Sequence, residues 1–121
     1  MDTRVTPLAT LKDPTLFKTD SYINGRWIKG KRRFDVTDPA TGQLLADVAD
    51  LGPKETQVAI DAANAAWPAW RDLTAKERHG VMMKWFHLLM EHQEDLARLM
   101  TAEEGKPMKE ARGEVAYGAN F

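Results

Sequence analysis

Residues 81–90 read VMMKWFHLLM, and this stretch decides how the fold is interpreted, because it is apolar on nearly every side of a helix. A helix that is apolar all round is buried all round. Thr74 and Gly105 are typical helix start and stop residues, and the helix between them would extend ~45 Å, whereas a chain of this size folds into a domain about 35 Å across. We therefore expect that its partner surface lies elsewhere. The alternative is a kinked helix that doubles back in a small bundle.

Upstream of this helix, apolar and polar residues alternate, which is typical of strands. Asn24-Gly25 is a strong hairpin signal, since both turn positions need positive φ angles. The predicted strands cover residues 21–23, 26–28, 34–37 and 44–49, and Asp38–Gly42 forms the second turn. We predict an α+β fold for this chain, with N-terminal β-hairpin strands followed by long packed helices.

From residue 52 the period changes to that of a helix. Gly52-Pro53 begins the first one, Pro68 is expected to end or kink it, and its apolar stripe consists of Val58, Ala59, Ala62, Ala63, Ala66 and Trp67. Thr74 and Glu77 form a capping box for the second helix, which the pattern extends to Glu104. Another helix starts at Met108. Near the N-terminus, Asp13-Pro14 predicts one short helical turn within a leader of residues 1–20.

Composition excludes several classes of function. The 121 residues carry 17 Lys+Arg against 18 Asp+Glu and no cysteine, so the chain has no thiolate nucleophile, disulfide or zinc-thiolate site. A formal charge of −1 gives no drive toward nucleic acid or anionic membranes. No apolar run is longer than that of Leu88–Met90, which is far too short to cross a bilayer, and no targeting signal is visible. We expect a cytoplasmic protein that binds neither nucleic acid nor membrane.

None of the local motifs identifies a catalytic site. The glycine and lysine spacing of residues 25–31 is that of a phosphate loop, but Arg32 stands where a magnesium-binding Ser or Thr is required. His87, Glu91 and His92 do not have metalloprotease spacing. No G-x-G-x-x-G is present, so no cofactor-binding residue can be assigned.

A series of motifs nevertheless resembles the N-terminal part of the aldehyde dehydrogenase superfamily, and within it the NAD(P)-dependent succinate-semialdehyde dehydrogenases. The resemblance depends on the order and spacing of the motifs rather than on any one of them. They are Tyr22–Trp27, Asp38–Gly42, Ala62-Ala63, Ala65–Trp70, Leu73–Arg78, Glu94–Thr101, Glu103–Pro107 and Glu110–Tyr117.

The resemblance implies a larger α/β enzyme, in which residues 21–121 are an incomplete N-terminal portion of the cofactor-binding domain. Family members oxidise an aldehyde to an acid with NADP or NAD, using a cysteine thiolate and a glutamate-activated water. Those residues lie beyond Phe121 in the family. We therefore expect the full-length protein to be a homo-oligomeric enzyme acting on a small aldehyde, here succinic semialdehyde. This chain alone is expected to bind no cofactor and to be inactive.

The resemblance also implies two sites that this chain would border. Many family members hold a monovalent cation with backbone carbonyls and an acid, which correspond to Val36, Thr37 and Glu103 here; the alternative is a strand end and an exposed acid. Tyr117 and Phe121 correspond to a wall of the substrate tunnel, and the alternative for them is core packing. A different function for the chain is a stand-alone helical module that binds a partner, or itself, through Trp85, Phe86 and Met90.

Overall fold

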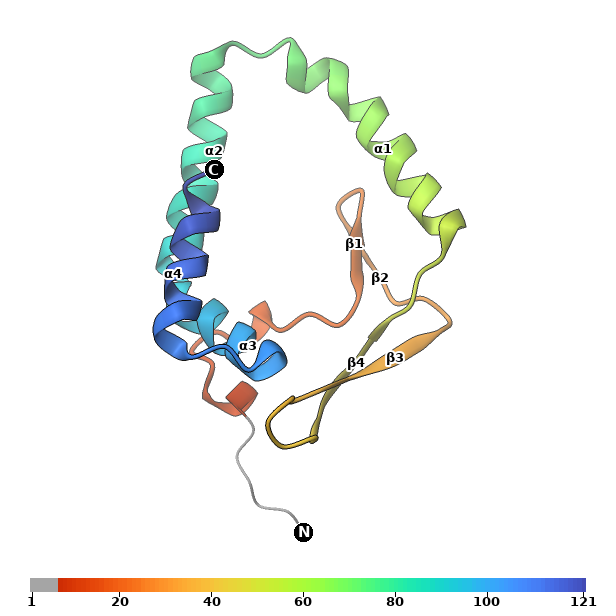
Figure 1. Ribbon diagram of the computed structural model, residues 1–121. Coiled ribbons are helices and arrows are strands. Elements are labelled where there is room, and N and C mark those ends of the chain that lie inside the picture. The colour runs from red at the N-terminus through yellow and green to blue at the C-terminus, as the bar shows by residue number, and fades with distance from the viewer. Residues whose placement is uncertain (1–6) are drawn as a thin grey trace.

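The computed structural model describes residues 7–121 and shows the expected α+β architecture (Figure 1). Two short 3-10 turns, η1 and η2, precede the strands, and the helices follow them. The elements are η1 (Pro7–Thr10), η2 (Pro14–Leu16), β1 (Ser21–Ile23), β2 (Arg26–Ile28), β3 (Arg33–Thr37), β4 (Leu44–Ala49), α1 (Pro53–Arg71), α2 (Ala75–Glu91), α3 (Gln93–Glu104) and α4 (Met108–Ala119). The fold class predicted for this part of the chain is confirmed.

The strands form two separate antiparallel pairs, as their turn residues predict. In the β1–β2 hairpin, Asn24 and Gly25 have φ angles of 48° and 76°, the left-handed values that this tight turn needs. The β3–β4 pair is longer and contains a bulge after Val36. Neither pair is part of a larger sheet within residues 7–121.

Local capping fixes where the two long helices begin. The Glu55 carboxylate accepts a hydrogen bond from the Gly52 N–H at 3.1 Å, at the start of α1. At the start of α2, the Glu77 carboxylate accepts from the Thr74 N–H at 2.8 Å, and the Thr74 hydroxyl accepts from the Glu77 N–H at 3.3 Å. These contacts satisfy amide groups that have no partner within a helix, so the predicted start sites are confirmed.

The predicted single helix from residue 75 to Glu104 is wrong, because the chain bends at His92. That residue has φ −97° and ψ 13° and separates α2 from α3. Its N–H still donates to the Leu88 carbonyl at 3.1 Å, and its carbonyl accepts from the Leu96 N–H at 3.0 Å. The backbone N–H and carbonyl of His92 therefore both keep helical hydrogen bonds at the bend. The bend turns α3 away from the axis of α2 (Figure 1).

Pro68 does not end α1, which continues to Arg71. Proline lacks the N–H that would bond four residues back, but its own carbonyl accepts from the Asp72 N–H at 3.0 Å. Pro68 lies in the last turn of the helix, where the loss of one bond is tolerated.

The buried core is small and lies between α3 and α4. Ala97, Ala111 and Val115 form it, with Leu96, Met100 and Met108 packed against them. In contrast, Trp85 of α2 is 59% exposed and Trp67 of α1 is 51% exposed. The α4 helix runs beside α2 (Figure 1), yet much of the apolar surface of residues 81–90 stays uncovered within the described chain. No helix among residues 7–121 has the length and apolar character needed to cross a membrane.

Two motifs that are far apart in the sequence meet where α3 ends. Gly105 has a φ of 76° and terminates α3, with its N–H donating to the Thr101 carbonyl at 2.9 Å. A Cβ atom at this position would lie 3.1 Å from Cγ of Pro39 in the β3–β4 turn. The close approach and the positive φ angle both require glycine here.

We expect Gly105→Ala to lower the free energy of unfolding by roughly 1–2 kcal/mol, because alanine is strained at a positive φ and would crowd Pro39. Gly113→Ala is the matched control. Gly113 lies inside α4 with open space around its Cα, and alanine should raise stability there by about 0.5–1 kcal/mol. Chemical denaturation measures both variants. Equal stability of Gly105→Ala and the parent protein would contradict this account of the turn.

Candidate functional site

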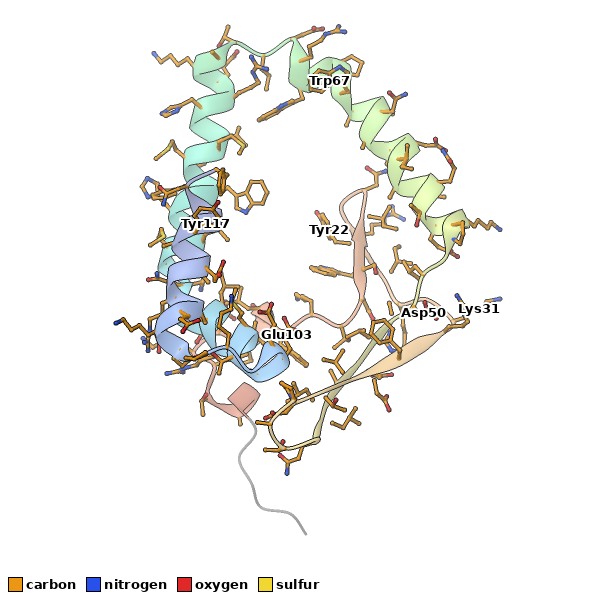
Figure 2. All side chains as sticks on the ribbon, viewed as in Figure 1. Tyr22, Lys31, Asp50, Trp67, Glu103 and Tyr117 are labelled. Carbon is orange, nitrogen blue, oxygen red and sulfur yellow. The ribbon has the colours of Figure 1, made fainter. Side chains whose placement is uncertain are left out.

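A cavity of about 170 Å³ lies where three parts of the chain converge. Its walls come from the end of η2 and the residues after it, from the β3–β4 pair and from α3. The lining residues are Leu16, Phe17, Lys18, Val36, Leu45, Ala46, Val48, Leu99, Ala102 and Glu103. Most are apolar, and Glu103 is the acidic residue among them. Figure 2 shows Glu103 on the side of α3 that is nearest the strands.

The structure brings together two of the three residues predicted to hold a cation. Val36 and Glu103 line the same cavity, while Thr37, the next residue of β3, is not part of its wall. The bulge lies at this point: Val36 pairs with Ala46 and Thr37 pairs with Leu44, so that Leu45 has no partner in the register. A bulge redirects the strand and leaves the extra residue outside the regular ladder.

Carboxylate and carbonyl oxygens are the donors that hard cations prefer, and the lining of this cavity includes the Glu103 carboxylate together with the positively charged Lys18. Burial raises the pKa of Glu103, and the nearby Glu104 carboxylate raises it further, so a bound cation would relieve an unfavourable negative charge. Within residues 7–121, no three His, Cys, Asp or Glu side chains gather closely enough to hold a metal by themselves. Backbone carbonyls would have to complete the coordination.

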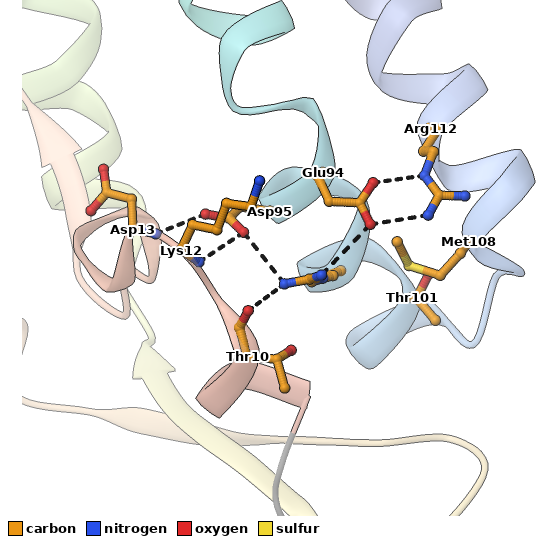
Figure 3. A network of polar contacts seen from close by, with 9 residues as sticks. Thr10, Lys12, Asp13, Glu94, Asp95, Thr101, Met108 and Arg112 are labelled. Carbon is orange, nitrogen blue, oxygen red and sulfur yellow. Dashed lines mark hydrogen bonds and ion pairs between the residues drawn. The ribbon is translucent and has the colours of Figure 1, made fainter.

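Residues 10–20, which we call the N-terminal strap, are fixed to α3 by Asp95 (Figure 3). The Asp95 side chain is buried, with 3% of the residue exposed. Its two oxygens accept hydrogen bonds from the N–H groups of Lys12 at 3.0 Å and Asp13 at 2.8 Å. These two bonds lower the pKa of Asp95 and keep it ionised.

Arg98 supports the same attachment. Its guanidinium lies 3.9 Å from the Asp95 carboxylate and donates to the carbonyl of Thr10. Sequence analysis did not single out Asp95 or Arg98 as functional residues. The available signal was an acid at the start of an otherwise apolar helical stripe, since Leu99 and Ala102 follow it at i+4 and i+7.

The other end of the strap is fixed to β3 and β4. The Thr19 carbonyl accepts from the Ala49 N–H at 2.8 Å and from the Arg33 guanidinium at 3.2 Å. Arg33 also forms ion pairs with Asp20 at 2.9 Å and Asp47 at 2.8 Å. The strap therefore connects α3 to the strands, and its middle portion forms one wall of the cavity.

Charged contacts between α3 and α4 fix the direction of α4. Glu94 and Arg112 form a bidentate pair with distances of 2.7 and 3.0 Å (Figure 3). Lys106, just before α4, pairs with Glu114 at 2.7 Å. Together with the small core, these contacts set the position of the aromatic residues at the end of α4.

Tyr117 and Phe121 form an edge-to-face pair with ring centroids 4.8 Å apart. Tyr117 is 65% exposed and Phe121 is 86% exposed, so neither ring belongs to the core of the described chain. Phe121 also borders an apolar groove with Met82, Met83 and Phe86 of α2. The two rings therefore present an exposed apolar surface at the end of α4.

Comparisons with a family model and with individual proteins indicate the same family. Residues 27–121 match the Aldehyde dehydrogenase family. The chain is 54% identical over 113 residues to the NADP+-dependent succinate-semialdehyde dehydrogenase of Escherichia coli, covering 92% of this chain and 23% of that protein. It is 52% identical over 113 residues to a glutarate-semialdehyde dehydrogenase of Pseudomonas putida, covering 92% of this chain and 24% of that protein.

Solved structures of related proteins contain the same fold as this chain. The crystal structure of succinate-semialdehyde dehydrogenase from Burkholderia pseudomallei matches with a TM-score of 0.88 and 46% identity, over 91% of this chain and 23% of that one. The chain thus spans about a quarter of the length of the relatives that it matches.

Proposed function

The chain belongs to the aldehyde dehydrogenase family, and from that premise we propose that the full-length protein oxidises succinic semialdehyde to succinate with NADP+ or NAD+. The observation that carries this proposal is the 54% identity to the succinate-semialdehyde dehydrogenase of Escherichia coli. A glutarate-semialdehyde dehydrogenase is 52% identical, so the substrate class is the semialdehyde of a short dicarboxylic acid.

In this proposal the chain itself contributes structure and supplies no reacting group. It contains no cysteine to act as the family's nucleophile. We assign none of its residues to cofactor binding. Its contribution is to build the strap, the cavity and the end of α4 on which the rest of the enzyme depends. We also propose that the full-length protein acts in the cytoplasm and forms a homo-oligomer, the latter testable by light scattering.

We expect the full-length protein to reduce NADP+ or NAD+ in the presence of succinic semialdehyde, followed as absorbance of the reduced cofactor. Glutarate semialdehyde is the competing substrate, and the isolated 121-residue chain is the matched control. The isolated chain should give no turnover above the blank, because it lacks the nucleophile. Turnover by the isolated chain would contradict its assigned role, and an inactive full-length protein would contradict the proposed reaction.

The same experiment separates the proposal from its alternative, a helical interaction module. The alternative is favoured by the exposure of Trp85, which is 59% exposed, whereas Phe86 and Met90 are half-buried. A large exposed apolar surface does promote association. An interaction module has no reason to reduce a nicotinamide cofactor, so aldehyde-dependent reduction by the full-length protein excludes the module as its main function.

We further propose that a monovalent cation binds at the edge of this cavity, held by the carbonyls of Val36 and of its neighbour Thr37 and by the carboxylate of Glu103. The support is the convergence of Val36 and Glu103 on one cavity beside the bulge. A cation there would stabilise the packing of β3 against the end of α3, and it would neutralise the Glu103 carboxylate. It has no direct part in the chemistry that we propose.

Potassium chloride should raise the melting temperature of the full-length protein, and Glu103→Gln should abolish the response by removing the charged oxygen ligand. Glu104→Gln is the matched control, since it removes an equal charge one residue away from the cavity wall. Tetramethylammonium chloride at equal ionic strength corrects for screening. A response of the parent protein that Glu103→Gln retains in full would rule out this carboxylate as a ligand.

For Tyr117 and Phe121 we propose a place in the wall of the substrate tunnel. The supporting observations are their exposure and their mutual edge-to-face contact. The aromatic pair would offer an apolar surface along which the carbon chain of the semialdehyde can pass. The contacts between Glu94 and Arg112 would then orient the wall indirectly, by fixing α4.

Tyr117→Ala should raise the KM for succinic semialdehyde several-fold, with a smaller effect on kcat, because it removes substrate contact and leaves the reacting groups intact. Tyr22→Ala provides the control: Tyr22 is also an exposed tyrosine, at 62%, but it lies on the β1–β2 hairpin, away from α4 (Figure 2). Equal KM values for the two variants would exclude Tyr117 from the tunnel wall.

A further inference from the structure

We propose that Arg112 is a positioning residue for the substrate tunnel: two side chains at the start of α3 hold it, and through α4 it sets the place of Tyr117 and Phe121. The inference rests on the tunnel wall proposed above. Arg112 itself is not part of that wall, because it precedes Tyr117 by five residues and its side chain is bound to α3.

Arg112 is held by both its side chain and its backbone. Its guanidinium donates to the two carboxylate oxygens of Glu94, from Nε at 2.7 Å and from a terminal nitrogen at 3.0 Å (Figure 3). Its carbonyl accepts a hydrogen bond from the side-chain amide of Gln93 at 2.9 Å. A helical carbonyl accepts from the N–H four residues later and has a second lone pair for such a donor. Two consecutive residues of α3 therefore fix one residue in the middle of α4.

The pair of Glu94 and Arg112 gives orientation more than stability. Two parallel hydrogen bonds between planar groups fix direction as well as distance. The hydrogen bonds between the two side chains lower the pKa of Glu94 and raise the pKa of Arg112, so both groups are charged at neutral pH. The side chains are 36% and 44% exposed, and exposed ion pairs contribute little to the free energy of unfolding. Loss of this pair should therefore move α4 without unfolding the protein.

The composition of α4 makes its position depend on such contacts. Gly113 and Gly118 lie within the helix, where each glycine is less favourable than alanine. The buried residues of α4 are Ala111 and Val115, two short side chains that interlock little with a neighbouring helix. The directional contacts at Arg112 then select one placement of α4 among those that this packing allows.

The end of α4 carries this placement to the two rings. Tyr117 lies within the helix, and Phe121 follows it by four residues, which places both rings on one side. The Phe121 N–H donates to the Gly118 carbonyl at 3.3 Å, so the chain stays attached to the helix beyond its last turn. The ring centroids are 4.8 Å apart. A shift of α4 at Arg112 would therefore displace both rings together.

The test is steady-state kinetics of the full-length protein with succinic semialdehyde, comparing Arg112→Gln with Arg71→Gln. Glutamine has no guanidinium, so Arg112→Gln loses the bidentate contact with Glu94. Arg71 is the matched control, because its guanidinium also pairs with a carboxylate, that of Asp72 at 2.9 Å, but at the end of α1.

We expect Arg112→Gln to raise the KM for succinic semialdehyde about threefold or more and to leave kcat within about twofold, because displaced rings weaken substrate contact while the reacting groups stay intact. Arg71→Gln should change neither value by more than about twofold. A merely structural role of Arg112 would reduce the fraction of folded enzyme, which lowers the apparent kcat and leaves KM unchanged. That result would overturn the inference.

A double variant shows whether Arg112 acts through the tunnel wall. In a protein that already carries Tyr117→Ala, Arg112→Gln should raise KM by less than about twofold, because changes that act through one contact are not additive. A full effect in that background would overturn the inference.

The single variants separate this inference from the proposals on which it rests. If Tyr117→Ala raises KM and Arg112→Gln does not, this inference alone fails. If Tyr117→Ala leaves KM unchanged, the tunnel wall fails and the inference fails with it. A full-length parent protein without activity would overturn the proposed function and, with it, this inference.

Gln93→Met keeps the test decisive if Arg112→Gln does not fold. Methionine has a similar length but no N–H to donate to the Arg112 carbonyl. We expect a KM about twofold above that of the parent, as a weaker form of the same effect. Gln57→Met is its control, since it removes a side-chain amide contact of 2.8 Å with Asp61 on α1. Equal KM values for these two variants would then overturn the inference.

Discussion

The buried carboxylate of Asp95, with two backbone N–H groups donating to it, is the contact on which the arrangement of this chain depends. An ionised group in the interior is stable only when its hydrogen bonds are satisfied. Here the donors come from Lys12 and Asp13, more than 80 positions away in the sequence. This contact fixes the strap to α3, while Arg33 and Ala49 fix its other end to the strands. The helical part and the stranded part are thereby held around one cavity.

Features that depend on neighbouring residues could be predicted from the sequence. The Asn24-Gly25 turn, the caps at Gly52 and Thr74, and the left-handed Gly105 each follow from the local conformational needs of a few residues. The bend at His92 could not be predicted, because no glycine or proline marks it. Nor could the role of Asp95, since a carboxylate on an apolar helical stripe does not reveal which distant amides it will meet.

The candidate site was predicted only through resemblance to a family. From composition and spacing alone, Val36 is an ordinary strand residue and Glu103 is an ordinary acid near the end of a helix. The structure shows that both border one cavity beside a β-bulge. Thr37 is not part of the wall, and the cation site stays a prediction. The exposed faces of α1 and α2 belong to a chain that spans about a quarter of the length of the relatives that it matches.

The most direct measurement of the central claim is amide hydrogen exchange of Lys12 and Asp13 in the folded full-length protein. If their N–H groups are bound to the buried Asp95 carboxylate, they should exchange slowly, near the rate of the α3 core amides around Ala97. Exchange of both amides at the rate of an unstructured peptide, with α3 still protected, would contradict the account, because the strap would then not be held by Asp95.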